Sequence, residues 1–167
     1  MQPTPQSDAM PTVNDTAPGV AAALGRIPSG LFIVGWREAD ADRAMLASWL
    51  MQAGFAPPLV SVAVAKSRDL FAAIERGASF AVSVLAETQR PLLARFGKPS
   101  DDPFAGLAVQ RTTSGSAALA DAAAWLECRP VARTDHGDHV VVLAEVTAAG
   151  GAGSEPLVHV RRNGLRY

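Results

Sequence analysis

Residues 45–69 decide the fold, and they read MLASWLMQAGFAPPLVSVAVAKSRD. A strand with small and hydroxyl side chains runs into a Pro-Pro break, and a second apolar strand follows at residues 59–64. Lys66, Ser67 and Arg68 then stand at the expected start of a helix. A cation, a hydroxyl and backbone N–H groups beside a sheet favour an oxyanion such as phosphate. The alternative is that Lys66 and Ser67 serve only solvation and capping.

Two helices are expected after this stretch. Residues 67–76 carry apolar side chains at helical spacing, with Ser67 as the N-cap and Gly77 as the stop. Residues 88–96 form the second helix, with Thr88 as its cap and Pro91 in the first turn, where proline is tolerated.

Strands are expected on both sides of the helices, because apolar or alternating runs are separated there by turn residues. The runs lie at residues 31–36, 44–52, 59–64, 79–85, 107–111, 123–134, 138–148 and 157–162. Residues 37–43 form a polar connector, residues 19–26 a short N-terminal helix, and residues 98–106 a loop. The predicted class is mainly β, a closed or nearly closed barrel with two inserted helices, since closure removes exposed sheet edges.

The bulk composition excludes several classes of protein. The 167 residues hold 15 basic and 16 acidic side chains, for a net charge of −1, so nothing favours a nucleic acid partner. Cys128 is the only cysteine, so no intrachain disulfide is expected, and a packed small hydrophobe is the expected role. No apolar run reaches the roughly 18 residues of a membrane span.

Domain organisation is expected to be simple. Residues 1–17 are rich in Pro, Thr, Gln, Ser and Asp, which predicts a flexible tail, and residues 18–167 are expected to form one folded domain. The tail lacks a basic region followed by an apolar stretch, so a cytoplasmic location is expected.

The second informative stretch is DHGDH at residues 135–139, which leads into a strand. A Gly-Asp-His turn points the imidazole of His139 from the rim of the barrel toward a ligand, and simple turn chemistry is the alternative. A metal site of Asp135, His136, Asp138 and His139 is the weakest reading, because no distant ligand is suggested, and none is predicted. The dinucleotide, P-loop and hydrolase-elbow fingerprints are absent from the sequence.

Several ordered pieces together resemble the flavin reductase-like family, whose members are FMN-binding split barrels that reduce flavin with a nicotinamide. The resemblance extends over roughly residues 22–167, and the pieces that carry it are LGRIPSGLF at 24–32, MLASW at 45–49, FAPPLV at 55–60, FAVSVL at 80–85, RF at 95–96, LEC at 126–128, GDH at 137–139 and RRNGLRY at 161–167.

The resemblance implies a specific flavin site. FMN would contact Met45, Leu46, Ala47, Ser48, Trp49, Gln52, Ala63, Val64, Lys66, Ser67, Arg68, Ser83, Phe96 and Tyr167. His139 would face the nicotinamide as the catalytic residue. Arg161 and Tyr167 would approach the flavin of a neighbouring subunit. The sequence departs from the family pattern at two positions: Ser83 stands where the family commonly has Asn, and Ala44 stands where it frequently has Asn or Thr.

The resemblance also implies cofactors and partners. Hydride would pass from NADH or NADPH to FMN, with FAD or riboflavin as alternative flavin substrates. The protein would be a homodimer with FMN at the subunit interface, and a monooxygenase or another acceptor would take the electrons. Two rival functions stay open: an FMN-binding electron-transfer protein without nicotinamide activity, and a split-barrel scaffold for another planar ligand or for none. Trp36, Trp49 and Trp125 are expected in the core rather than stacked on the flavin, and Trp49 is the best candidate among them for an interface or ring neighbour.

Overall fold

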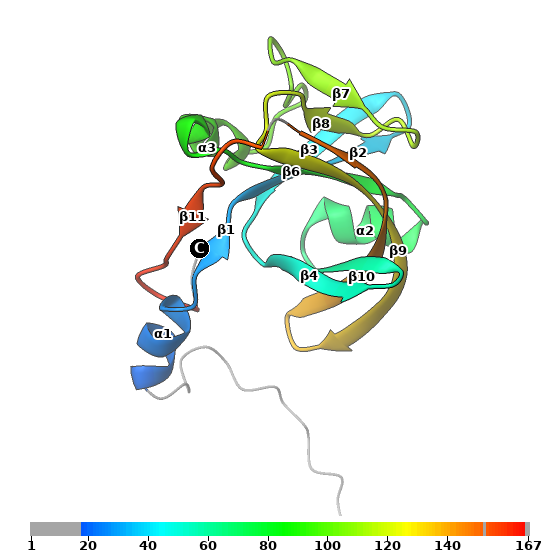
Figure 1. The fold of residues 1–167 in the computed structure, drawn as a ribbon. Coiled ribbons are helices and arrows are strands. Elements are labelled where there is room, and N and C mark those ends of the chain that lie inside the picture. The colour runs from blue at the N-terminus through cyan, green and yellow to red at the C-terminus, as the bar shows by residue number, and fades with distance from the viewer. Residues whose placement is uncertain (1–17, 152, 166–167) are drawn as a thin grey trace, which may run out of the picture. The chain divides into compact units, whose positions relative to one another are not determined.

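The computed structural model describes residues 18–151 and 153–165, and the chain divides into two compact units (Figure 1). Among the described residues, 18–28 and 160–165 belong to unit one, and 29–151 and 153–159 belong to unit two. The predicted tail at residues 1–17 lies outside the described residues. The expected single domain over residues 18–167 stays a prediction, and each unit is considered by itself.

Unit one joins α1 (Pro18–Gly25), the predicted N-terminal helix, to a segment near the other end of the sequence. The Gly164 N–H donates to the Ala21 carbonyl at 2.7 Å, and the Arg161 N–H donates to the Gly25 carbonyl at 3.1 Å. A Cβ built on Gly164 would lie 2.3 Å from the Leu24 Cβ, so only glycine permits this backbone approach.

Unit two is mainly β, as predicted. Its strands are β1 (Ser29–Gly30), β2 (Phe32–Glu38), β3 (Ala41–Ala47), β4 (Leu50–Phe55), β5 (Pro58–Ala65), β6 (Phe80–Val84), β7 (Val109–Arg111), β8 (Ala117–Leu119), β9 (Ala124–His136), β10 (His139–Gly150) and β11 (Val158–His159). Its helices are α2 (Asp69–Glu75), the single 3-10 turn η2 (Glu87–Gln89) and α3 (Leu92–Phe96).

The central sheet is antiparallel and runs in the order β3-β2-β6-β9-β10-β5-β4. Its two edge strands, β3 and β4, are nevertheless consecutive in sequence, with only Ser48 and Trp49 between them. Three peptide units span at most about 11 Å, so the edges must meet at this link and the sheet must curl into a barrel. Among the described residues no backbone ladder joins β3 to β4, which makes the barrel split rather than closed.

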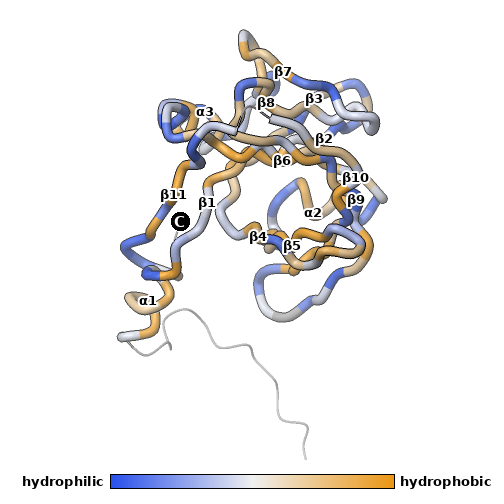
Figure 2. The backbone as a smooth tube through the Cα atoms, in the orientation of Figure 1, coloured by the Kyte–Doolittle hydropathy of each residue, from blue (hydrophilic) through white to orange (hydrophobic). Residues whose placement is uncertain are grey.

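The core inside the curl is built from the inward side of each strand and from one face of α2. Val60, Val62 and Val64 alternate along β5, and α2 adds Leu70, Ala73 and Ile74 from within the curve of the strands (Figure 1). β6 is mainly hydrophobic along its length, whereas the tip of the β9–β10 hairpin is hydrophilic (Figure 2). Polar side chains are therefore concentrated at the turn between β9 and β10, and apolar side chains line the strands of the core.

Cys128 and Trp36 also belong to this core, as predicted. Burial raises the pKa of the Cys128 thiol to about 12, so the side chain packs as a small hydrophobe and not as a nucleophile.

The opposite face of the sheet is covered by α3 and β8, where Phe96, Phe104 and Leu119 pack against Ile33. β8 approaches β2 closely at Gly35. A Cβ built on Gly35 would lie 2.3 Å from the Ala117 carbonyl oxygen, which belongs to the backbone of β8. This glycine is therefore required by the close approach of two strands.

Replacing Gly35 with Ala is expected to lower the free energy of unfolding by about 3 kcal/mol, because a backbone atom cannot move aside as a flexible side chain does. Chemical denaturation measures the loss. Gly19→Ala is the matched control, since nothing lies within 4 Å of a Cβ there and the same methyl is added. Equal stability of the two variants would show that β8 does not pack on β2 in this way.

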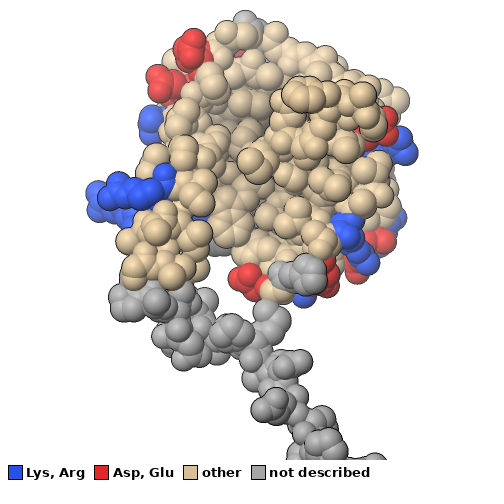
Figure 3. All heavy atoms as spheres, turned by 60° about the horizontal axis from the view of Figure 1, so that its bottom comes forward, with Lys and Arg blue, Asp and Glu red and all other residues tan. Residues whose placement is uncertain are grey.

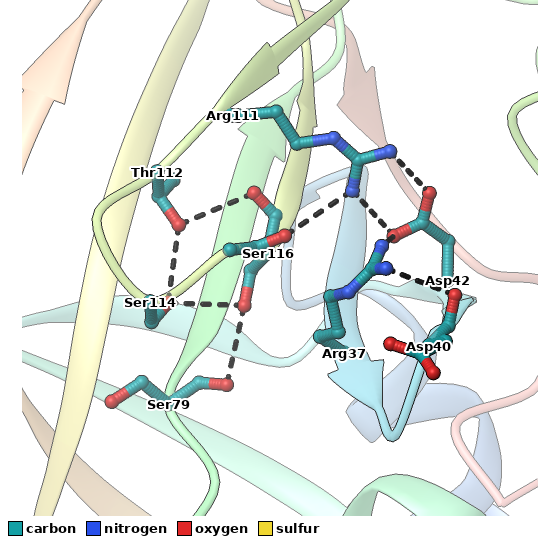
Figure 4. Close-up of polar contacts among 9 residues, drawn as sticks. Arg37, Asp40, Asp42, Ser79, Arg111, Thr112, Ser114 and Ser116 are labelled. Atoms are coloured by element: carbon teal, nitrogen blue, oxygen red, sulfur yellow. Dashed lines mark hydrogen bonds and ion pairs between the residues drawn. The ribbon is translucent and has the colours of Figure 1, made fainter.

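A polar cluster anchors the β7–β8 hairpin to the β2–β3 hairpin (Figure 4). Both terminal nitrogens of Arg111 donate to the Asp42 carboxylate, at 2.5 and 2.6 Å, and Arg37 donates to the same carboxylate at 3.2 Å. The hydrogen bond from Arg111 holds the pKa of Asp42 below its usual range. Beside the Arg111–Asp42 pair, the hydroxyls of residues 112, 114 and 116 form a chain of hydrogen bonds, and the last of them donates to the backbone carbonyl of residue 79.

Asp42→Asn is expected to lower the free energy of unfolding by about 2 kcal/mol at neutral pH, because a two-point bond to a charged group is lost. A carboxyl whose pKa is depressed by folding adds stability above its unfolded pKa, near 3.9, and loses it as the pH falls through the folded pKa. The difference between wild type and variant should therefore shrink below about pH 4. Asp40→Asn is the control, because Arg37 bonds to the backbone carbonyl of Asp40 and not to its carboxylate. If the stability difference between wild type and Asp42→Asn does not change with pH, the proposed role of the Asp42 carboxylate is wrong.

The structure corrects several predicted boundaries. The expected connector at residues 37–43 is a two-residue turn, and the expected strand at residues 44–52 is broken at the Ser48–Trp49 link. The second helix is divided into η2 and α3, so Thr88 lies inside η2 and is not its cap. β8 was not predicted, because a run of three apolar residues is too short to show the alternation that indicates a strand.

Candidate functional site

The link between β3 and β4 places Ser48 and Trp49 at the point where the barrel splits. The Ser48 side chain is buried, whereas Trp49 is 39% exposed. The Trp49 carbonyl accepts a hydrogen bond from the Ala63 N–H at 2.9 Å, which ties the link to the middle of β5. A large aromatic ring therefore stands partly in solvent beside small side chains of β5.

His139 reaches the same place from the start of β10. Gly137, at φ 88°, makes the tight turn from β9, and His139 then pairs with Ala65 of β5. The His139 ring lies 4.8 Å from the Trp49 ring, centroid to centroid, at 54°. Nδ1 of His139 lies 2.9 Å from the Asp138 carboxylate, and this hydrogen bond keeps the pKa of Asp138 low. Since an ionised carboxylate only accepts, the Nδ1 atom carries a proton.

Lys66 completes the group, which we call the rim cluster: Trp49, Lys66, Asp135, Asp138 and His139. The Lys66 N–H donates to the Asp138 carbonyl at 3.0 Å, so its backbone is fixed to the β9–β10 turn. Its ammonium forms an ion pair of 2.6 Å with Asp135, although both side chains are about half exposed. Lys66, the predicted phosphate-binding cation, is therefore paired with Asp135 in the structure, and the sequence did not predict this pair.

Ser67 and Arg68 follow Lys66 in an exposed turn before α2. The N-cap of α2 is Arg68, which makes no capping hydrogen bond with its side chain, so the prediction of Ser67 as the N-cap is wrong. The hydroxyl of Ser67 and the guanidinium of Arg68 are exposed beside the rim cluster.

Three predicted flavin contacts are in the core instead. Val64 is fully buried on the inward side of β5. Ser83 is 1% exposed, and its hydroxyl accepts a hydrogen bond from the Leu119 N–H at 2.8 Å on the face covered by β8. Phe96 is buried against Phe104, with ring centroids 5.5 Å apart. The structure does not bring these three side chains to the rim cluster.

The other predicted residues divide between the barrel wall and solvent. Met45 and Ala47 pack toward the inner core, whereas Leu46 packs toward the opposite face of the sheet. Gln52 is exposed on β4, the neighbour of β5. Tyr167 lies outside the described residues, and Arg161 belongs to unit one.

A pocket of about 330 Å³ lies in unit two, near the start of β3, and was not predicted from the sequence. Its lining residues are Trp36, Arg43, Ala44, Asp69, Pro99, Ser100 and Asp101. The structure pairs Arg43 with Trp36 across β3 and β2, which places an arginine beside a core tryptophan, and no local sequence pattern indicates this pairing. Residues 99–101 fall within the loop predicted at residues 98–106.

Among the residues that the structure describes, no three His, Cys, Asp or Glu side chains lie close enough together to hold a metal ion. None of the helices described is both long enough and apolar enough to cross a membrane.

Residues 24–165 match the flavin reductase like domain family. The chain belongs to this family. Among curated relatives, the diflavin flavoprotein A 1 of Synechocystis sp. (strain PCC 6803) is 40% identical over 152 residues. That alignment covers 87% of this chain but 26% of the relative, so the chain spans about a quarter of the length of the curated relatives it matches.

Solved structures of this family share the fold. The NADH:FAD oxidoreductase of Streptomyces globisporus C-1027 is 27% identical with a TM-score of 0.77, over 83% of this chain and 85% of that one. The styrene monooxygenase flavin reductase of Pseudomonas putida S12 is 25% identical with a TM-score of 0.74, over 83% and 90%. The predicted family and its split-barrel fold are therefore confirmed.

Proposed function

We propose that this chain is an NAD(P)H-dependent flavin reductase that binds FMN along β3 and the rim cluster. The observation that carries the proposal is that Trp49, Lys66 and His139, from three separate parts of the sequence, lie together where the barrel splits. The structural neighbours named as flavin reductases support the flavin, and the neighbour named as an NADH:FAD oxidoreductase supports the nicotinamide donor.

The residues present fit a planar ring beside the β3–β4 link. β3 is an edge strand, so alternate N–H and C=O groups along it face away from β2 and can bind ribityl hydroxyls. Ala63 and Ala65, on the outward side of β5, are small enough for a ring to approach the backbone. Trp49 adds an exposed aromatic surface, so the flavin would be held by shape and by backbone groups.

The phosphate end would lie at the turn after β5. Lys66 and Arg68 supply charged donors there, and Ser67 supplies a hydroxyl. Phosphate binding requires Lys66 to exchange Asp135 for the phosphate, since the two are paired in this structure.

His139 would position the nicotinamide. A bound flavin supplies the redox chemistry by accepting the hydride, so the protein needs only to orient the two rings and exclude water. Asp138 holds the His139 imidazole at Nδ1, and Trp49 limits its tilt, so the ring is pre-oriented before the donor arrives.

The direct test mixes flavin-loaded protein with NADH or NADPH without oxygen and follows the visible absorption band of oxidised flavin. The proposal expects rapid bleaching with at least one donor. If neither donor bleaches the band while dithionite does, nicotinamide activity is absent.

That second outcome would favour the alternative function, an FMN-binding electron-transfer protein. The relatives named as diflavin flavoproteins support it, because this chain covers only a quarter of them and another flavin-carrying part is implied by their name. A separate flavoprotein or a monooxygenase would then exchange electrons with the chain. A reduced flavoprotein partner would bleach the flavin band where NADH and NADPH do not.

We also propose a homodimer with FMN at the subunit interface. β4 is an edge strand, and it exposes Met51 and Phe55, which are 68% and 88% accessible. In Figure 3, which turns the bottom of Figure 1 forward, charged side chains lie at the border and few lie in the middle. Light scattering should give twice the chain mass, and Phe55→Asp should shift it toward the monomer; a monomeric wild type would contradict the interface.

A further inference from the structure

The pocket near the start of β3 is separate from the rim cluster. Arg43 and Ala44 of β3, Asp69 of α2 and residues 99–101 line it together with Trp36. From Ala44 to Trp49 the chain advances five residues, on the order of 15 Å along extended backbone. The pocket and the proposed ring site therefore lie along one continuous strand, separated by more than the width of a single ring system.

The charges in the pocket disfavour a phosphate. Asp69 and Asp101 contribute two carboxylates, and Arg43 contributes one guanidinium. Arg43 is not free to offset them, because its Nε lies 3.5 Å from the Glu38 carboxylate, which also pairs with Arg76. An added anion would meet uncompensated negative charge, whereas a neutral group with several O–H or N–H donors would be favoured.

The polar groups of the pocket are mainly acceptors. The carboxylates of Asp69 and Asp101 and the hydroxyl of Ser100 can each accept from a ligand hydroxyl. A carboxylate that accepts from vicinal ribose hydroxyls is a common way to bind a nucleoside. Pro99 and Trp36 add apolar surface, and the buried indole N–H of Trp36 has no hydrogen-bond partner among the described residues. A volume of about 330 Å³ is within the range of small-molecule sites.

We propose that this pocket binds the adenosine ribose of a dinucleotide, with Asp101 and Asp69 accepting from its hydroxyls. The inference rests on the proposed function, because the rest of the same dinucleotide would reach the rim cluster. FAD and NADH both carry this nucleoside with its 2′ and 3′ hydroxyls unmodified, and they are the two sources to be distinguished.

The test measures dissociation constants of FAD, FMN and riboflavin by flavin fluorescence, and KM for NADH and for reduced nicotinamide mononucleotide. The variants are Asp101→Asn, which removes an acceptor charge, and Ser100→Trp, which fills the pocket. Asp102→Asn is the matched control, since it makes the same change at the next residue, outside the lining. Thermal melting confirms that each variant is folded.

If FAD is the source, wild type binds FAD about 10-fold tighter than FMN, and Asp101→Asn and Ser100→Trp remove that preference while FMN and riboflavin stay within twofold. If the nicotinamide donor is the source, both variants raise KM for NADH about 10-fold and leave that of the mononucleotide unchanged. Asp102→Asn changes neither value.

Two results would overturn the inference. Unchanged ratios in both variants would show that the pocket binds no adenosine, and tighter FMN binding by Asp101→Asn would show that it holds a phosphate. Failure of the proposed function is distinct, since wild type would then bind none of the three flavins, or would bind them without their reduction by NADH or NADPH.

Discussion

His139→Ala is expected to slow flavin reduction by NADH or NADPH roughly 100-fold, with flavin affinity within threefold of wild type. The His139 imidazole is held between the Asp138 carboxylate and the Trp49 ring. Its removal would leave the nicotinamide ring without the side chain that positions it. Stopped-flow absorbance under anaerobic conditions gives the rate, and fluorescence titration gives the affinity.

His159→Ala is the matched control, because His159 lies on β11 and pairs with Ser29, not with the rim cluster. Its rate should equal that of wild type. If His139→Ala reduces flavin as fast as wild type, His139 is a turn residue and the proposed nicotinamide position is wrong.

Lys66→Ala is expected to weaken FMN binding about 10-fold and to leave riboflavin binding within twofold. The two flavins differ only by the phosphate, so the ratio of their dissociation constants isolates the contribution of the charge. Isothermal titration with each flavin supplies both constants. A loss of less than about twofold for FMN, or about 0.4 kcal/mol, would remove the phosphate role of Lys66.

Asp135→Asn gives the opposite test of the same cation. Asp135 competes with an incoming phosphate for the Lys66 ammonium, since the two are paired at 2.6 Å. Neutralising Asp135 should tighten FMN about two- to threefold, a small effect because the pair is exposed. Riboflavin should be unaffected, and equal changes for both flavins would point to a general loosening of the turn.

Much of the fold could be predicted because local patterns are strong here. β5 alternates apolar and smaller residues, and the helix at α2 has apolar side chains at helical spacing. The break at Ser48–Trp49 could not be predicted, because residues 44–52 are continuous and apolar enough for one strand. The break follows from the curl of the whole sheet, in which β3 and β4 become opposite edges that must meet.

The candidate site was predicted in part for similar reasons. Lys66 stands in the turn after β5, and His139 directly follows the Gly137–Asp138 turn as the first residue of β10, so turn residues in the sequence mark both positions. Val64 and Ser83 lie in strands, where a shift of one residue reverses the face, and both side chains face away from solvent. The ion pair of Lys66 with Asp135 and the pocket at Asp101 arise from segments far apart in sequence, so no local pattern could reveal them.

The most direct test of the central claim is a crystal structure of the protein grown with excess flavin. Our account predicts the flavin ring against Trp49 and the outward side of β5, with its phosphate within hydrogen-bond distance of Lys66 or Arg68. Flavin bound elsewhere on the chain, or only solvent beside Trp49 and Lys66, would contradict it.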